Sequence, residues 1–154
     1  MAPMPNQTDM RQAQDLLFFA YRDFTNAADV VLAELRLGRA HHRALHFIGR
    51  NPGMTVTELL GILRITKQSL ARVLNDLLAA GYVAQAPGQG DRRQRLLRLT
   101  ESGTALEERL FAAQADRLGS AYAAAGPHAV TGFRAVMRAI MDAEARAYME
   151  RDGK

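Results

Sequence analysis

The sequence has 154 residues, of which 48% are hydrophobic and 23% charged, and it contains no cysteine. This length and composition are typical of one globular domain with an attached arm, and they exclude a large multidomain enzyme and a chain disordered throughout. The lack of cysteine excludes disulfides, thiolate metal sites and cysteine nucleophiles, and it fits a protein of the reducing cytoplasm. Residues 1–8 have no signal-peptide pattern, so we expect a short tail there and no membrane partner.

Positive charge is concentrated in about a quarter of the chain. The stretch from Arg64 to Arg98 carries seven basic and two acidic residues, whereas the whole chain has a net charge of +4. A local surplus of this kind is typical of a surface that meets a polyanion, although a solvated basic face has the same composition.

The first part of the chain predicts a long helix and then a short one. Apolar residues recur every three or four positions over residues 17–35, which predicts an amphipathic helix over residues 8–37. Residues 39–50 predict a second helix, which ends before Pro52-Gly53 because proline cannot donate into a continuing helix.

Two further helices follow, separated by a tight turn. Thr55-Val-Thr-Glu58 has the pattern of a capping box and predicts the start of a short helix. Thr66 has the residue type of the next N-cap, and residues 66–80 place their leucines and Val73 on one face of a helix that Gly81 closes.

A hairpin and more helices complete the predicted fold. Residues 82–86 and 94–99 predict short strands around a glycine-rich turn. Thr100 starts another helix, and one last helix is expected after Gly126-Pro127, with apolar residues as far as Tyr148. The fold class is therefore mainly α with a small two- or three-stranded β wing, a winged helix-turn-helix.

The outward face of the helix over residues 66–80 has the chemistry of a base-reading surface. Arginine can donate to O6 and N7 of guanine, and glutamine can pair with N6 and N7 of adenine. A polar face alone is more typical of an ordinary amphipathic helix, but the adjacent basic hairpin favours DNA. The predicted DNA-binding residues of this helix are Thr66, Lys67, Gln68, Ser69, Arg72 and Asn75.

The hairpin carries a second candidate site. Asp91 precedes Arg93 by two residues, so its carboxylate can brace the guanidinium through a bidentate ion pair. An arginine held in this way suits the narrow, electronegative minor groove, whereas the same residues in an isolated turn describe only a solvated loop. The predicted DNA-binding residues of the hairpin are Asp91, Arg92, Arg93 and Arg95.

Several segments resemble the MarR (multiple-antibiotic-resistance regulator) family of transcription factors. The stretch Asp91-Arg-Arg-Gln-Arg-Leu-Leu-Arg-Leu-Thr100 is similar to that family's wing, and Leu77-Leu-Ala-Ala-Gly-Tyr-Val83 is similar to the helix end and strand before it. Val56-Thr-Glu-Leu-Leu60 and Ile65-Thr-Lys-Gln-Ser69 resemble its helix signatures in the same order. The similarity covers about residues 37–110.

The resemblance implies an organisation as well as a fold. It implies an obligate homodimer, made by a dimerisation helix over residues 1–37 and dimerisation helices over residues 101–154, with a DNA-binding domain over residues 38–100 between them. It further implies that Arg93 enters the minor groove with Asp91 as its brace. Members of the family commonly repress genes from a pseudo-palindromic operator until a small-molecule effector binds between the dimerisation and DNA-binding parts of the protein.

The segment Arg39-Ala-His-His-Arg-Ala-Leu-His46 departs from the family by its histidines. His42 and His46 lie four residues apart on the predicted helix, so they can share a ligand or, with His41, a metal. No carboxylate nearby in sequence completes three metal ligands, so we expect no metal. Structural histidines are the first interpretation, and a ligand pocket lined by His42 and His46 is the second.

We therefore predict a sequence-specific regulator that binds double-stranded DNA, with no cofactor. No phosphate-binding loop, Ser/His/Asp arrangement or carboxylate pair occurs in the context that catalysis needs, so we expect no enzyme. Two alternatives remain: a winged-helix adaptor that binds proteins without DNA affinity, and a metal-responsive regulator that uses His42 and His46.

Overall fold

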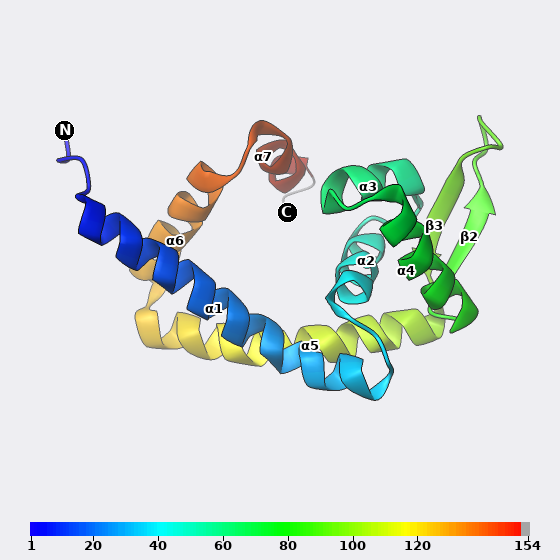
Figure 1. Cartoon of the computed structure of the whole chain (residues 1–154), viewed down its shortest axis with the longest axis horizontal. Helices are drawn as coiled ribbons and strands as arrows, with labels where there is room; N and C mark the ends of the chain where they lie inside the picture. The colour runs from blue at the N-terminus through cyan, green and yellow to red at the C-terminus, as the bar shows by residue number, and fades with distance from the viewer. Residues whose placement is uncertain (152–154) are drawn as a thin grey trace.

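The computed structural model describes residues 1–151, which form an arm of long helices and a lobe of short elements (Figure 1). The lobe is the part from α2 to β3, and α7 returns to it from the far end of the arm. None of the helices over residues 1–151 has the length and apolar character needed to cross a bilayer. The elements in chain order are α1 (Gln7–Glu34), α2 (Arg39–Arg50), β1 (Met54–Thr55), α3 (Val56–Leu63), α4 (Lys67–Ala79), β2 (Val83–Pro87), β3 (Arg95–Leu99), α5 (Glu101–Ala125), α6 (Pro127–Ile140) and α7 (Ala143–Glu150).

The core lies in the lobe and is built from aliphatic side chains. Leu45 and Ile48 of α2 are fully buried, as are Leu70 and Leu77 of α4. The arm contributes to the same core through the last turns of α1 and the first turns of α5, where Leu110 is fully buried. The lobe therefore packs against the C-terminal end of α1 and the N-terminal end of α5.

Threonine caps start three of the predicted helices. The hydroxyl oxygen of Thr55 accepts a hydrogen bond from the backbone N–H of Glu58 at 3.1 Å, and Thr66 and Thr100 cap α4 and α5 in the same way. Each such bond satisfies a backbone donor that the first helical turn leaves without a partner. Gly81 follows α4 with a φ of +78°, the left-handed backbone that glycine adopts at little cost.

The wing is a three-stranded antiparallel sheet in the order β1-β3-β2. The predicted hairpin forms its larger part, with Val83 opposite Leu99 and Pro87 opposite Arg95. The third strand, β1, pairs Met54 with Leu97. A strand of two residues is too short to show alternation of apolar and polar positions, so periodicity does not predict it.

The C-terminal part departs from the predicted single helix. The chain leaves helical geometry at Met141, and the carboxylate of Asp142 accepts a hydrogen bond from the N–H of Ala145 at 2.9 Å, which starts α7 as a separate helix. The apolar stripe of α1 also departs from expectation, because Leu17 and Tyr21 in its first half are exposed while Ala28 is buried.

Candidate nucleic-acid interface

The start of α4 is fixed by a turn and a cap. Arg64 ends α3 in the left-handed conformation with a φ of +53°, which turns the chain sharply between α3 and α4. Thr66 then accepts a hydrogen bond from the N–H of Ser69 at 3.1 Å. Leu70, Val73, Leu74 and Leu77 hold the inner face of α4 in the core, so the orientation of its outer face is determined by packing.

The outer face of α4 presents polar side chains that have no partner among residues 1–151. Gln68, Arg72 and Asn75 follow one another at i, i+4 and i+7, and all three are exposed, as is Lys67. Their side chains make no hydrogen bond or ion pair with any of residues 1–151. Donors and acceptors left open in this way can bind base edges and phosphates.

Ser69 and Thr66 differ from the other predicted residues of the helix. The Thr66 hydroxyl donates to the hydroxyl oxygen of Ser69 at 2.8 Å and also accepts the capping bond from its N–H. Ser69 is half-buried. Both residues are therefore engaged in building the helix start, and their part in a DNA contact stays a prediction.

A side-chain contact that the sequence did not indicate ties α4 to α2. Nε2 of His41 lies 2.9 Å from Oδ2 of Asp76, and Nδ1 of the same ring accepts a hydrogen bond from the N–H of Gly38 at 3.0 Å. The ring thus links the start of α2 to the outer part of α4. Since the two residues are distant in sequence, only their shared place in the fold identifies the pair.

The wing tip holds Asp91 and Arg93 together. Oδ1 of Asp91 accepts a hydrogen bond from the N–H of Arg93 at 2.9 Å and lies 3.5 Å from Nε of its guanidinium. The expected bidentate pair is replaced by this single oxygen, which contacts backbone and side chain at once. The Arg93 side chain is 95% exposed, so its guanidinium projects from the tip. The Asp91 carboxylate restrains this side chain through its contacts with the N–H and Nε of Arg93.

The remaining basic residues of the hairpin are open to solvent. Arg92 and Arg95 are exposed, and their side chains make no ion pair with the described residues. Figure 1 shows α4 and the ribbon of β2 and β3 as neighbours at the end of the molecule away from the N-terminus. The two groups of predicted residues are therefore carried by adjacent elements.

Arg64 contributes less to this basic surface than the sequence suggests. Its Nη2 donates to Asp142 at 2.6 Å and to Glu144 at 3.1 Å, both at the start of α7. Two carboxylates offset its charge, so the free cations of the surface are the ones on α4 and the wing.

His42 and His46 are half-buried on α2. Burial lowers the pKa of both rings from the usual 6.5, because an imidazolium loses hydration there. Arg50 lowers the pKa of His46 further, whereas Asp29 opposes the lowering at His42. Nδ1 of His46 lies 4.0 Å from Oε1 of Glu107, whose own pKa is raised by burial. Among residues 1–151, no group of three or more His, Cys, Asp or Glu side chains is arranged to hold a metal ion.

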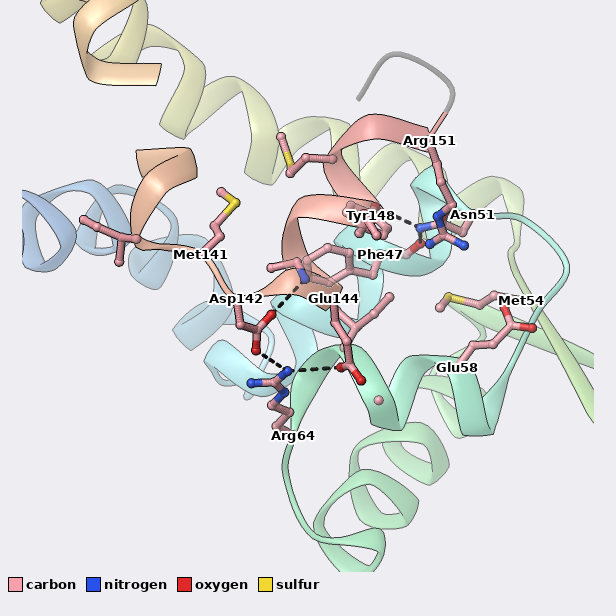
Figure 2. A pocket seen from close by; sticks show the side chains of 16 residues that line it. Phe47, Asn51, Met54, Glu58, Arg64, Met141, Asp142, Glu144, Tyr148 and Arg151 are labelled. Carbon is pink, nitrogen blue, oxygen red and sulfur yellow. Dashed lines mark hydrogen bonds and ion pairs between the residues drawn. The ribbon is translucent and has the colours of Figure 1, made fainter. Parts of the chain in front are cut away.

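A cleft of about 930 Å³ lies between α7 and the lobe (Figure 2). Its walls combine apolar side chains such as Phe47, Met54 and Ile62 with the Arg64 ion pairs at one end. Neither His42 nor His46 lines it. The predicted histidine pocket and this cleft are thus different places, and the histidine pocket stays a prediction.

Comparison with known proteins identifies the family. A model of the MarR family matches residues 37–94. Over 141 residues, which are 92% of this chain and 85% of the relative, the sequence is 50% identical to the HTH-type transcriptional regulator PetP of Rhodobacter capsulatus. The chain belongs to the MarR family of winged-helix regulators.

Solved structures of the MarR family share the fold. A mutant MarR from E. coli in complex with operator DNA superposes with a TM-score of 0.69 at 19% identity, covering 90% of this chain and 100% of that one. A MarR-family regulator from Silicibacter pomeroyi gives a TM-score of 0.72 at 21% identity, covering 83% and 86%. At these identities the likeness concerns the fold, and it confirms the winged helix-turn-helix with a small β wing.

Proposed function

We propose that this MarR-family regulator is a homodimer that binds double-stranded DNA with sequence specificity at a pseudo-palindromic operator. The observation that carries the proposal is the open polar face of α4, with Lys67, Gln68 and Arg72 exposed and without partners in the described chain. In this proposal α4 enters the major groove and Arg93 enters the adjacent minor groove. The operator complex of the E. coli MarR supports this use of the fold.

The arm supports the homodimer. Its first helix exposes Leu16 and Phe18, and α6 exposes Phe133, Val136 and Ile140. Among the described residues, every large apolar side chain that is exposed lies before α1 or on α1, α5 or α6, and none lies in the lobe. Apolar surface collected on one part of a molecule in this way is typical of a protein interface. A two-fold dimer would hold its two α4 helices about 34 Å apart, one turn of B-DNA.

The regulatory outcome in this proposal is repression that a small-molecule effector relieves. Support for it comes from the family as a whole, whose members commonly act in this way. His42 and His46 are the residues we propose for effector contact, because both are half-buried on α2, the lobe helix that packs against α1 and α5 of the arm.

The function is tested with arginine variants on DNA. The operator is selected from a random duplex library, and binding of Arg72→Ala and Arg93→Ala is compared on the selected and scrambled duplexes. We expect Arg72→Ala to cost about 1 to 3 kcal/mol and to blur base preference, whereas Arg93→Ala weakens both duplexes more evenly. Arg11→Ala, exposed on α1, is the matched control. Negligible losses for both test variants would refute the assignment.

A salt series separates DNA binding from the adaptor alternative. Each phosphate that a cation neutralises lowers log K by about 0.9 per unit of log salt concentration, so binding through the basic face falls steeply with salt. For Arg93→Ala, we expect the slope of log K against log salt concentration to become shallower by about 0.9, the value for one lost phosphate contact. A flat response, or no binding at low salt, would indicate an adaptor.

A further inference from the structure

Helix α7 is fastened to the lobe at both of its ends (Figure 2). At its start, Asp142 and Glu144 accept hydrogen bonds from Nη2 of Arg64 at 2.6 Å and 3.1 Å. In its last turn, the hydroxyl of Tyr148 accepts a hydrogen bond from Nδ2 of Asn51 at 3.1 Å, and its ring packs edge-on against Phe47 with centroids 5.7 Å apart. Two attachment points restrain rotation of a short helix as well as its displacement.

Asp142 serves two structures with its two oxygens. Oδ1 accepts the N–H of Ala145 and caps α7, while Oδ2 accepts the guanidinium of Arg64. The pKa of this carboxyl is lowered, first by the backbone hydrogen bond and then by Arg64. The start of α7 and its attachment to the lobe are therefore made by one side chain.

Arg64 lies where a shift would reach the base-reading face directly. It ends α3 in the left-handed conformation and precedes by two residues the Thr66 cap of α4. The attachment of α7 is thus made to the turn of the helix-turn-helix motif.

Helix α6 has few other constraints on its place relative to the lobe. No residue of α6 is buried within the described chain. Its contact with α5 is made near the C-terminal end of α5, where Phe133 lies edge-on to Tyr122. At its other end, only Met141 and Asp142 separate α6 from α7. The attachment of α7 therefore acts together with the α5 contact in setting how the apolar face of α6 is oriented relative to α4.

We propose that α7 is a strap that couples the dimer-forming face of α6 to the start of α4, with Arg64 as its positioning residue. This inference rests on the proposed function, because the consequence appears in a dimer on DNA. The buried ends of α1 and α5 already join arm and lobe, and the strap is a second connection that narrows the range of angles between them. It therefore narrows the range of separations of the two α4 helices, and with it the range of half-site spacings that the regulator accepts.

The chemistry of the strap suits adjustment of orientation. The Arg64 side chain is 60% exposed and Asp142 is 48% exposed, and exposed ion pairs are individually weak. None of the strap residues belongs to the buried core. Loss of the ion pairs should therefore leave the fold intact and shift the population of lobe orientations by about two- to fivefold for each pair.

The first test measures orientation without DNA. Because the chain has no cysteine, Gln85→Cys on β2 and Arg138→Cys on α6 place two spin labels at exposed sites, and labelled chains are mixed with an excess of unlabelled chain. Arg64→Asn removes the guanidinium with a residue that tolerates left-handed backbone. Arg36→Asn is the matched control, since Arg36 is exposed, has a φ of +57° and forms no ion pair within residues 1–151. We expect a broader label distance in Arg64→Asn, a wild-type distance in Arg36→Asn, and recovery in Arg64→Lys.

A double variant distinguishes the strap from an effect of charge alone on DNA binding. Asp142→Asn with Glu144→Gln removes two negative charges while asparagine keeps the cap of α7. Simple electrostatics predicts tighter DNA binding and an unchanged label distance. The strap predicts the same broadening as in Arg64→Asn, although the charge change has the opposite sign.

The second test uses DNA of altered spacing. On the selected operator and on versions with base pairs inserted between the half-sites, we expect both strap variants to reduce the wild-type preference for native spacing by about two- to fivefold. Label distances as narrow as in wild type for both strap variants would overturn the strap while leaving DNA binding in place. Broadened distances in a chain that binds no DNA would overturn the proposed function and retain the mechanical coupling.

Discussion

The wing tip holds an acidic side chain within a surface proposed to bind a polyanion. Oδ1 of Asp91 contacts both the N–H and the guanidinium of Arg93, and the guanidinium is otherwise open to solvent. An acidic residue at such a place repels phosphate, so its presence needs a compensating role. Restraint of Arg93 supplies that role, because a long side chain loses rotamer freedom when it enters a groove, and a braced side chain loses less.

This interpretation makes a prediction of unusual sign. Asp91→Ala removes a negative charge from the surface proposed to bind DNA and should nonetheless weaken operator binding, by about two- to fivefold, since the brace is lost. Asp91→Asn keeps an oxygen for the N–H of Arg93 and should fall between Asp91→Ala and wild type. Binding is measured by fluorescence anisotropy on a labelled operator, with Glu108→Gln on α5 as the charge control. Tighter binding of Asp91→Ala would show that the carboxylate only repels DNA.

The two half-buried histidines give the fold a dependence on pH. Burial lowers the pKa of His42 and His46 from the usual 6.5, so the unfolded chain binds protons at a higher pH than the folded one. The contribution of the two rings to the free energy of unfolding is then fully present above about pH 7. It is lost as the pH falls through 6.5 towards the lowered pKa values of the folded state.

We therefore expect wild type to lose stability between about pH 7.5 and 5.5, and the double variant His42→Gln/His46→Gln to show a flatter profile. Urea unfolding followed by circular dichroism at several pH values measures this. His128→Gln, exposed on α6, is the matched control. Equal slopes for the double variant and wild type would exclude the two rings as the cause.

Residues whose role is local could be predicted from the sequence, and those whose role depends on distant partners could not. The outward face of α4 follows from helical periodicity once Leu70 and Leu77 are assigned to the core. The pairing of Arg64 with Asp142 and that of His41 with Asp76 join segments that only the tertiary fold brings together. The sequence alone therefore places Arg64 in the basic surface, because its carboxylate partners are distant along the chain.

The junction of the wing and α5 is tightly packed around Gly103. A Cβ at this position would lie 1.8 Å from the carbonyl oxygen of Tyr82, which is backbone and cannot move aside alone. The first turn of α5 is also held there by the Thr100 cap and by a hydrogen bond from Ser102 to the carbonyl of Gly81. The close approach explains why a glycine stands inside a helix.

Two glycine variants test this packing. Gly103→Ala should destabilise the protein by about 3 kcal/mol through overpacking. Gly61→Ala, in α3 with no atom within 4 Å of the added Cβ, should stabilise it by up to about 1 kcal/mol through helix propensity. Urea unfolding of both variants measures the difference. Equal stabilities would mean that α5 shifts freely away from Tyr82.

Elements with strong local signals were predicted with nearly correct bounds. The helix over residues 39–50 is α2 without change, and the threonine caps mark the starts of α3, α4 and α5. The separate helix α7 was missed because apolar residues continue in sequence across Met141, and a single aspartate cap does not announce a break by itself. The apolar stripe of α1 leaves Leu17 and Tyr21 exposed among the described residues, and sequence periodicity does not say which surface a stripe meets.

The distribution of exposed apolar residues divides the protein into two parts. The lobe exposes polar and basic side chains, whereas the arm exposes Leu16 and Phe18 on α1 and Phe111 on α5. Exposed apolar surface of this kind is unfavourable in water, and the long helices of the arm have little core of their own. A second copy can cover the surface with the same surface, since two-fold dimers use self-complementary patches.

The proposed dimer predicts a large effect of one charge on the arm. Burial of a phenylalanine side chain contributes about 2 kcal/mol, and two-fold symmetry counts it twice, so Phe18→Glu should weaken the dimer by about a thousandfold. Sedimentation velocity over a concentration series measures this, with Gln85→Glu on the exposed surface of β2 adding the same charge to the lobe as a control. Operator affinity should fall together with dimer mass, because a single lobe contacts one half-site only. A monomeric wild type, or a Phe18→Glu variant with unchanged mass, would contradict an interface on the arm.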